Sequence, residues 1–211
     1  MLTFSEWIKA LWMFIKGIPI ELSSFVITPI ALLFCKKEDE HLPKWLYWYD
    51  EPNFGINGDY GWKKDHFPEP TNKTWWGRTR WLWRNRINGY QIAKQGYNVE
   101  KTDISTLRIL GDPNATSIRG RADTFCVVRV KDTSQKEYFA LYYEKKWCKY
   151  FYIRMYIGWK LMDISNMKTA SDIGNWISRR KSEGKSTTLE SVFSIYPFKK
   201  AWTNSYTIKI F

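Results

Sequence analysis

Apolar residues recur at helical spacing at the start of the chain. Side chains three or four residues apart share one face of a helix, and residues 4–16 place five apolar side chains in this way: Phe4, Ile8, Leu11, Trp12 and Ile15. Lys9 and Lys16 fall toward the other side. Gly17 and Pro19 then interrupt the pattern, and both residue types disfavour a helix interior. The pattern therefore predicts a first helix that ends near Gly17 and a second apolar segment after it.

Residues 18–34 are almost wholly apolar, which leaves several roles open. A membrane-spanning helix needs about 20 apolar residues, and this run is slightly short and contains Glu21 and Pro29. A signal peptide would begin with basic residues and end at a small-residue cleavage site, which this sequence does not show. An interfacial or re-entrant helical hairpin fits the glycine–proline break, the flanking lysines, and Trp7 and Trp12. A buried helix pair in a soluble core is the alternative.

A basic pair and a group of aromatic residues follow the apolar run. Lys36 and Lys37 come first, and several tryptophans lie in the next segment. This order is typical of a protein at a membrane interface, where amphipathic rings lie at the level of the headgroups. We therefore expect six apolar side chains to contact a membrane: Trp7, Trp12, Phe25, Ile30, Trp45 and Trp48.

Residues 50–59 form a short loop that is rich in Asp, Asn and Gly. Oxygen ligands for a hard cation such as calcium are present at four positions: Asp50, Asn53, Asn57 and Asp59. Their spacing does not match an EF-hand, and Asx residues also cap their own backbone in ordinary turns. The loop therefore predicts turns first and a metal site second.

Tryptophan and arginine are concentrated in residues 74–95, which we predict to be one helix capped by Thr74. Seven of the 13 tryptophans of the chain fall between Trp45 and Trp83. The predicted helix interleaves them with a row of arginines: Arg78, Arg80, Arg84 and Arg86. Like charges at this spacing repel unless an anion lies between them, so the row is a candidate anion-binding site. Alternatively, the tryptophans pack in a core and the arginines pair with acidic residues of the chain.

From residue 121 onward the apolar pattern changes to the alternation of β-strands. Segments rich in Val, Tyr, Phe and Ile are separated by short polar turns, and residues 170–180 form a short helix. We expect an α+β fold with N-terminal apolar helices and a Trp/Arg-rich helix packed on an antiparallel meander of four to six strands. By composition the chain divides into an apolar helical segment (1–35), an aromatic and polar loop region (36–73) and an α+β domain (74–211).

Charge and motif content narrow the function. The 211 residues include 33 Lys and Arg against 21 Asp and Glu, a net charge of +12, which favours nucleic acid, anionic headgroups or acidic proteins as partners. Cys35, Cys126 and Cys148 form no CxxC pair, so we expect free thiols in a reducing compartment and leave a Cys126–Cys148 bridge open. No nucleophile-elbow, metalloprotease or phosphate-loop motif occurs in the sequence. We therefore expect a non-enzymatic protein without a cofactor or small-molecule ligand.

Four segments together resemble a family of small proteins of tailed bacteriophages and prophages. They are LPKWLYWYDEPNFGINGDYGW (residues 42–62), RWLWRNRINGY (80–90), YIRMYIGWKL (152–161) and FSIYPFKK (193–200). The resemblance spans most of the chain, and its motifs are structural signatures rather than a chemistry. It implies a phage origin and no particular reaction.

Three functions follow from these observations. The favoured one is a bacteriophage protein that binds an anionic membrane surface through its apolar N-terminus, in the host cytoplasm or at the inner membrane, or within the virion. The first alternative is a basic nucleic-acid-binding protein. In that protein, strand tyrosines would serve as base-stacking platforms: Tyr143, Tyr150, Tyr152 and Tyr156. The second is a virion structural or assembly protein that docks on a phage or host protein through its N-terminus.

Exposure of the N-terminal apolar residues separates these functions. If Trp7, Trp12, Phe25 and Ile30 are exposed, a membrane or assembly role is favoured, because exposed apolar side chains are available to an external surface. If they are buried, the segment is core and nucleic-acid binding is favoured.

Overall fold

The computed structural model describes residues 1–116, 123–148, 151–162, 169–183, 189–197 and 206–209. By contact in space the chain forms two units, one of Met1–Trp12 with Gly96–Phe211 and one of Met13–Gln95. The long helix α1 (Phe4–Ala31) contributes its first residues to one unit and the remainder to the other. This division follows spatial contacts, whereas the three segments above follow composition along the chain.

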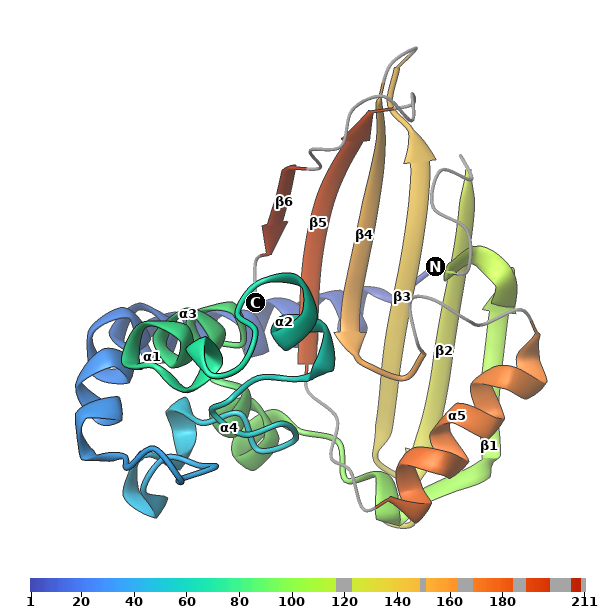
Figure 1. Ribbon diagram of the computed structural model, residues 1–211. Coiled ribbons are helices and arrows are strands. Elements are labelled where there is room, and N and C mark those ends of the chain that lie inside the picture. Colours follow the sequence, from blue (N-terminus) through green and yellow to red (C-terminus); the bar gives the residue numbers. More distant parts are fainter. Residues whose placement is uncertain (117–122, 149–150, 163–168, 184–188, 198–205, 210–211) are drawn as a thin grey trace. The chain divides into compact units, whose positions relative to one another are not determined.

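A six-stranded antiparallel sheet runs through the first unit (Figure 1). Its strands lie in chain order: β1 (Thr102–Gly111), β2 (Thr124–Asp132), β3 (Glu137–Lys146), β4 (Phe151–Trp159), β5 (Leu189–Pro197) and β6 (Tyr206–Lys209). Each strand pairs with the next, as where Val127 faces Leu141 and Tyr142 faces Tyr156. The predicted α+β class and antiparallel meander are confirmed.

The middle of the sheet is covered on both faces. Every residue of β3 from Tyr138 to Tyr142 is buried. In a strand with one face exposed to solvent, buried and exposed residues would alternate. The helix α5 (Ala170–Ser182) packs against β1 and buries Ile173 and Ile177. Its N-terminus has a reciprocal capping box, in which the Thr169 hydroxyl accepts from the Asp172 N–H and the Asp172 carboxylate accepts from the Thr169 N–H. The short turns η5 (Val99–Lys101) and η6 (Pro113–Thr116) complete the described helical parts of this unit.

The first turns of α1 also pack in this unit. Lys9 Nζ lies 5.0 Å from the ring centre of Trp159 and donates a hydrogen bond of 3.1 Å to the carbonyl of Glu137. The Trp159 ring in turn meets Tyr138 and Phe139 edge to face. An aromatic cluster therefore holds the start of α1 beside β3 and β4.

The N-terminal segment is not the predicted hairpin. α1 is one helix from Phe4 to Ala31 that continues through Gly17, Pro19 and Pro29 and is followed by the single turn η1 (Leu32–Phe34). A proline inside a helix costs about 3 kcal/mol, so the prediction from local propensity was reasonable. Tertiary packing also acts on the helix where local propensity would end it. Gly17, for example, is buried beside Ile87, whose Cδ1 would lie 3.6 Å from a Cβ at Gly17.

Residues 74–95 are not one helix either. Thr74 caps α3 (Trp75–Arg84) as predicted, because its hydroxyl accepts a hydrogen bond of 3.1 Å from the Gly77 N–H. The helix then ends, and Ile87 adopts a left-handed conformation with φ of 53° before α4 (Asn88–Tyr90) and the π-helical turn η4 (Gln91–Gln95). A β-branched residue rarely adopts positive φ. The Ile87 side chain is 1% exposed, so its packing imposes the break.

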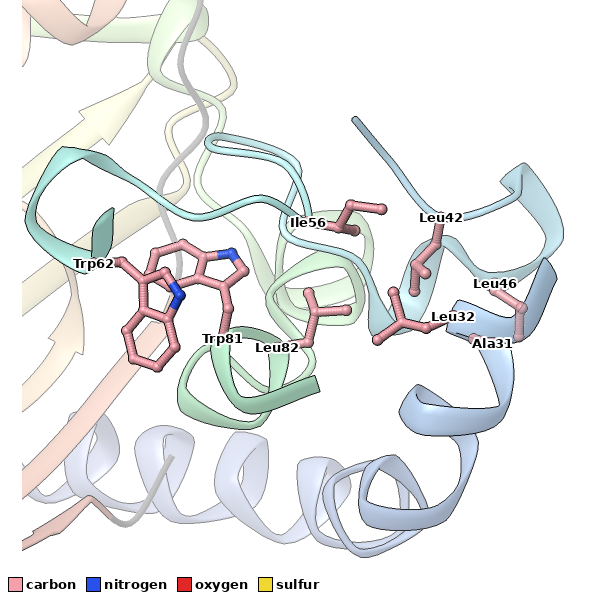
Figure 2. Packing of buried hydrophobic residues seen from close by; sticks show 8 residues of the cluster. All are labelled: Ala31, Leu32, Leu42, Leu46, Ile56, Trp62, Trp81 and Leu82. Atoms are coloured by element: carbon pink, nitrogen blue, oxygen red, sulfur yellow. The ribbon is translucent and has the colours of Figure 1, made fainter. Parts of the chain in front are cut away.

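The second unit has its own apolar core (Figure 2). Its other elements are η2 (Lys44–Tyr49), α2 (Tyr60–Asp65) and η3 (Thr71–Lys73). Eight buried residues form the cluster: Ala31, Leu32, Leu42, Leu46, Ile56, Trp62, Trp81 and Leu82. The Trp81 indole N–H donates to the Gly55 carbonyl at 2.8 Å, so this large ring is buried without losing its hydrogen bond. α4 packs on η2 at Gly89, where a Cβ would overlap the Tyr47 carbonyl oxygen.

Candidate membrane-binding surface

α1 directs polar side chains toward the protein and apolar side chains toward solvent. Four of its polar residues are at most 8% exposed: Glu6, Glu21, Ser24 and Thr28. Many of its large apolar residues are at least 37% exposed: Phe4, Trp7, Ile8, Leu11, Trp12, Ile15, Leu22, Phe25, Val26 and Ile30. A surface helix of a water-soluble protein has the opposite arrangement. We call the exposed set, together with Leu33, the apolar stripe of α1.

Helical geometry places these two sets on opposite sides. At about 100° per residue, Phe4, Ile15 and Leu22 project within about 20° of one another. By the same rotation, Glu6 and Ser24 project roughly 160° or more away from them. In each unit the exposed apolar side chains of α1 therefore lie away from its buried polar side chains.

Ion pairs fasten the polar side of α1. In the first unit the Glu6 carboxylate accepts from the Arg129 Nε at 2.6 Å and from its Nη2 at 2.8 Å. Burial raises the pKa of Glu6, but hydrogen bonds from Arg129 and Thr3 outweigh that effect and leave this pKa below its ordinary value. In the second unit the Glu21 carboxylate pairs with Arg86. Two buried charges of the helix are therefore paired where the protein covers them.

All six side chains predicted to contact a membrane are exposed. In the first unit Trp7 and Trp12 are 37% and 56% exposed. In the second unit four more are at least 40% exposed: Phe25, Ile30, Trp45 and Trp48. The exposure criterion stated above therefore favours a membrane or assembly role over a core role for this segment.

Two further tryptophans, which the sequence did not lead us to include, lie near the C-terminal end of α1. Trp75 and Trp76 are each 47% exposed and stack on one another. The Trp75 indole N–H donates to the Pro29 carbonyl at 2.9 Å, and this carbonyl is one that a helix end leaves without an intrahelical donor. Phe34 meets Trp45 edge to face nearby. The C-terminal end of α1 is thus surrounded by exposed aromatic rings.

The four arginines do not form one exposed row. Arg78 is 4% exposed, and its guanidinium donates to the Asn57 side chain and to the carbonyls of Lys36, Lys37 and Asp39. It therefore holds the loop after η1 in place and is not available to an external anion. Arg86 is paired with Glu21 and also donates to the Trp83 carbonyl.

Arg80 and Arg84 are exposed. Their guanidinium groups lie 5.6 Å from the Phe67 ring and 5.7 Å from the Trp62 ring, respectively. Contact with aromatic faces orients both groups while leaving their N–H donors to solvent. These two arginines are the part of the predicted row that an external anion can reach.

Three of the four candidate metal ligands have side-chain partners within the protein: Asp50, Asn57 and Asp59. Asp59 accepts from the Trp62 N–H and caps α2, and Asn57 bonds Arg78 and the Asp39 carbonyl. Asp50 is bound to His41, with 2.9 Å between the carboxylate and Nδ1. Across the part of the chain that the structure describes, no group of three or more His, Cys, Asp and Glu side chains is arranged to hold a metal ion. The turn interpretation accounts for this loop.

Asp50 is buried and pairs with His41. Burial raises the pKa of Asp50, while the charge and hydrogen bond of His41 act in the opposite direction.

The three cysteines are unpaired thiols, so the open possibility of a Cys126–Cys148 bridge is not realised. Burial raises the pKa of Cys126 to about 12, which keeps this thiol protonated and unreactive.

Two of the four strand tyrosines are buried and present no face for base stacking. Tyr152 and Tyr156 are at most 6% exposed, and the Tyr156 hydroxyl donates to the Trp159 carbonyl. Tyr143 is half-buried, and Tyr150 lies outside the described residues. Rings that stack on bases must present a face to solvent. The prediction that these residues bind nucleic acid through stacking is therefore wrong for the buried pair.

The sequence contained a signal for the polar side of α1 that was not used. Glu21, Ser24 and Thr28 are three or four residues apart, so they share one helical face. They were treated as interruptions of an apolar run. As a polar stripe within that run, they indicate which side of the helix the protein covers.

Comparison with known proteins identifies a family without an assigned activity. The chain belongs to DUF7338, a family of unknown function, which matches residues 2–202. No curated protein and no solved structure matches it. Among the described residues, the stretch Phe4–Phe34 is long and apolar enough to cross a membrane, a test that soluble core helices and signal sequences also pass. The family match confirms that most of the chain belongs to one family of unknown function, while its phage origin stays a prediction.

Proposed function

We propose that this DUF7338 member is a non-enzymatic protein that binds an anionic membrane surface with α1 lying in the plane of the interface. The observation that carries the proposal is the polarity of α1, whose apolar stripe faces outward while Glu6, Glu21, Ser24 and Thr28 face the protein. Amphipathic helices of interfacial proteins immerse such a stripe at the boundary of headgroups and acyl chains.

The exposed area supplies a sufficient driving force. Moving a fully exposed Leu, Ile or Phe side chain out of water contributes about 1.5–3 kcal/mol. Phe4, Leu22 and Val26 are 81%, 63% and 63% exposed, so each retains most of that gain for a partner. The tryptophans at the two ends of the helix suit the interface, where an apolar ring and a polar N–H are both accommodated.

The two ion pairs favour an in-plane helix over a spanning one. Glu6 and Glu21 are 15 residues apart, or about 22 Å along the axis, and each is bound to an arginine of the folded protein. The hydrocarbon core is about 30 Å thick. A helix that spanned it would carry at least one of these pairs and its surroundings into hydrocarbon, at a high energetic cost. An in-plane helix keeps each pair within its own unit and outside the hydrocarbon.

Charge and origin complete the proposal. The net charge of +12 and the exposed Arg80 and Arg84 favour anionic lipids, which attract basic residues by about 1 kcal/mol each near the surface. The resemblance to tailed-phage proteins suggests the cytoplasmic face of the host inner membrane, or a membrane-directed part of the virion. A genomic survey of DUF7338 tests that origin, since phage proteins lie among phage or prophage genes.

Flotation of the full chain with vesicles tests the function. We expect co-flotation with anionic vesicles that persists in high salt, because insertion of apolar side chains is not screened whereas charge attraction is. Competing DNA should not release the protein. Absence of flotation with salt-sensitive DNA binding would replace the proposal by nucleic-acid binding. Absence of both would assign the apolar stripe to a protein partner in an assembly.

A further inference from the structure

A cavity of about 370 Å³ in the second unit combines aromatic walls with two lysines. It is lined by Met13 and Lys16 of α1, Trp48 of η2, Tyr90 of α4, and Lys94 and Gln95 of η4. Trp48 and Tyr90 meet edge to face with ring centres 5.3 Å apart, and Lys94 Nζ lies 5.8 Å from the Trp48 ring centre. Among these lining residues none is acidic.

The cavity lies at the edge of the apolar stripe. Ile15 belongs to the stripe, and Lys16 projects about 100° further around the helix, toward the polar side. Lys16 and Trp48 are both exposed, whereas Met13 is half-buried deeper in the site. When the stripe is immersed, this edge is at the depth of the lipid headgroups, where lysine and tryptophan side chains are both stable.

The π-helical turn η4 positions the second lysine. The Gln95 amide donates to the Met13 carbonyl at 2.8 Å, which ties the end of η4 to α1. The wider π-turn changes the direction of its side chains relative to an α-helix, and such turns are frequent at functional sites. Lys16 and Lys94 thereby line one cavity although they are far apart in the sequence.

We propose that this cavity binds the phosphate group of one anionic phospholipid, with the start of its acyl chains against Trp48, Tyr90 and Met13. Two ammonium groups attract the single negative charge of a phosphodiester, and the apolar walls suit the acyl chains attached to it. A free inorganic phosphate shares the charge chemistry but leaves the aromatic walls in water. The inference rests on the proposed function, because a lipid that is part of a bilayer reaches the cavity only when α1 lies at the membrane surface.

Calorimetry with a soluble lipid tests the cavity separately from membrane binding. Dihexanoylphosphatidylglycerol, kept below its critical micelle concentration, is titrated into the full chain, and inorganic phosphate is titrated in parallel. We expect saturable binding of one lipid and much weaker binding of phosphate. The variant Lys16→Gln/Lys94→Gln should weaken lipid binding by tenfold or more. The control Lys37→Gln/Lys64→Gln, which removes two exposed lysines of the same unit, should bind as the wild type does.

Each other outcome overturns the assignment in a distinct way. Phosphate that binds as tightly as the lipid would make the cavity a free-anion site. Equal lipid binding by the two variants would mean that net charge alone attracts the lipid. A wild type that floats with vesicles but does not bind the soluble lipid would contradict the cavity and leave the proposed function standing. Thermal unfolding of both variants verifies that each is folded.

Discussion

Replacing three apolar-stripe residues near the C-terminal end of α1 by glutamine should release the protein from membranes without unfolding it. Leu22, Val26 and Leu33 are 63%, 63% and 71% exposed. If full transfer of such a side chain is worth about 1.5–3 kcal/mol, the exposed part of each contributes about 1–2 kcal/mol. The three together contribute about 3–6 kcal/mol, which corresponds to roughly two to four orders of magnitude in the partition coefficient.

The assay is the fraction of protein bound as a function of lipid concentration, measured for Leu22→Gln/Val26→Gln/Leu33→Gln and the wild type in high salt. Exposed positions contribute little to folding, so the free energy of unfolding should change by less than about 1 kcal/mol. Deletion of residues 1–34 is a poorer test, because Ala31 and Leu32 lie in the core of the second unit.

The matched control removes two exposed apolar side chains that lie outside α1. Leu110 and Trp147 are 50% and 63% exposed and belong to the first unit. The variant Leu110→Gln/Trp147→Gln should partition as the wild type does. A stripe variant that partitions within threefold of the wild type would refute the reasoning. Equal losses in both variants would show that general surface apolarity, rather than α1, drives binding.

Three further predictions concern charged residues. Arg80→Gln/Arg84→Gln should weaken binding to anionic vesicles at low salt by about 1 kcal/mol per arginine and leave the salt-resistant part unchanged; unchanged affinity at low salt would make both residues structural. Arg78→Met should lower the free energy of unfolding by about 3 kcal/mol or more, because it leaves several carbonyl groups without donors; a loss under 1 kcal/mol in denaturant titration would contradict its role. The pKa of Glu6 is lowered from 4.5 by its partner Arg129, so its contribution to stability is complete above pH 4.5 and is lost as the pH falls through the lowered pKa. Glu6→Gln should flatten that part of the pH–stability curve, and an unchanged curve would refute the assignment.

The β-sheet was predictable because each of its strands carries a strong local pattern. Alternation and β-branched or aromatic residues identify β2 and β4, and the short polar turn after β2 leaves an antiparallel partner as the simplest geometry. β1 was missed. Its burial is irregular and its register shifts between Asp103 and Arg108, so it lacks the alternation that identifies a strand.

The helical breaks were predicted poorly because local propensity was taken as decisive. Gly17 and Pro19 were expected to end the first helix, but α1 continues through both. Ile87 has no breaking propensity, yet the helix after Thr74 is interrupted there by a left-handed residue. In both places tertiary packing outweighs a local cost of a few kcal/mol.

The arginine row illustrates the same limit for function. Their closeness in the sequence identified four arginines as a group: Arg78, Arg80, Arg84 and Arg86. It gave no means to tell which of them are buried and which are exposed. The structure buries Arg78 among carbonyl groups and pairs Arg86 with Glu21, which leaves Arg80 and Arg84 exposed. A partner more than 40 residues away in the chain decides the role of such a residue.

The sequence by itself determined that this chain is a basic α+β protein with an apolar N-terminus and tryptophans beside it. Those properties depend on composition and on periodicity within one element, which are local. Only the tertiary structure decided which partners the polar side of α1 meets, because Arg129 and Arg86 lie far from Glu6 and Glu21 in the sequence. Buried carboxylates require such partners, so the polar side faces inward and the apolar stripe is left for the membrane surface that we propose.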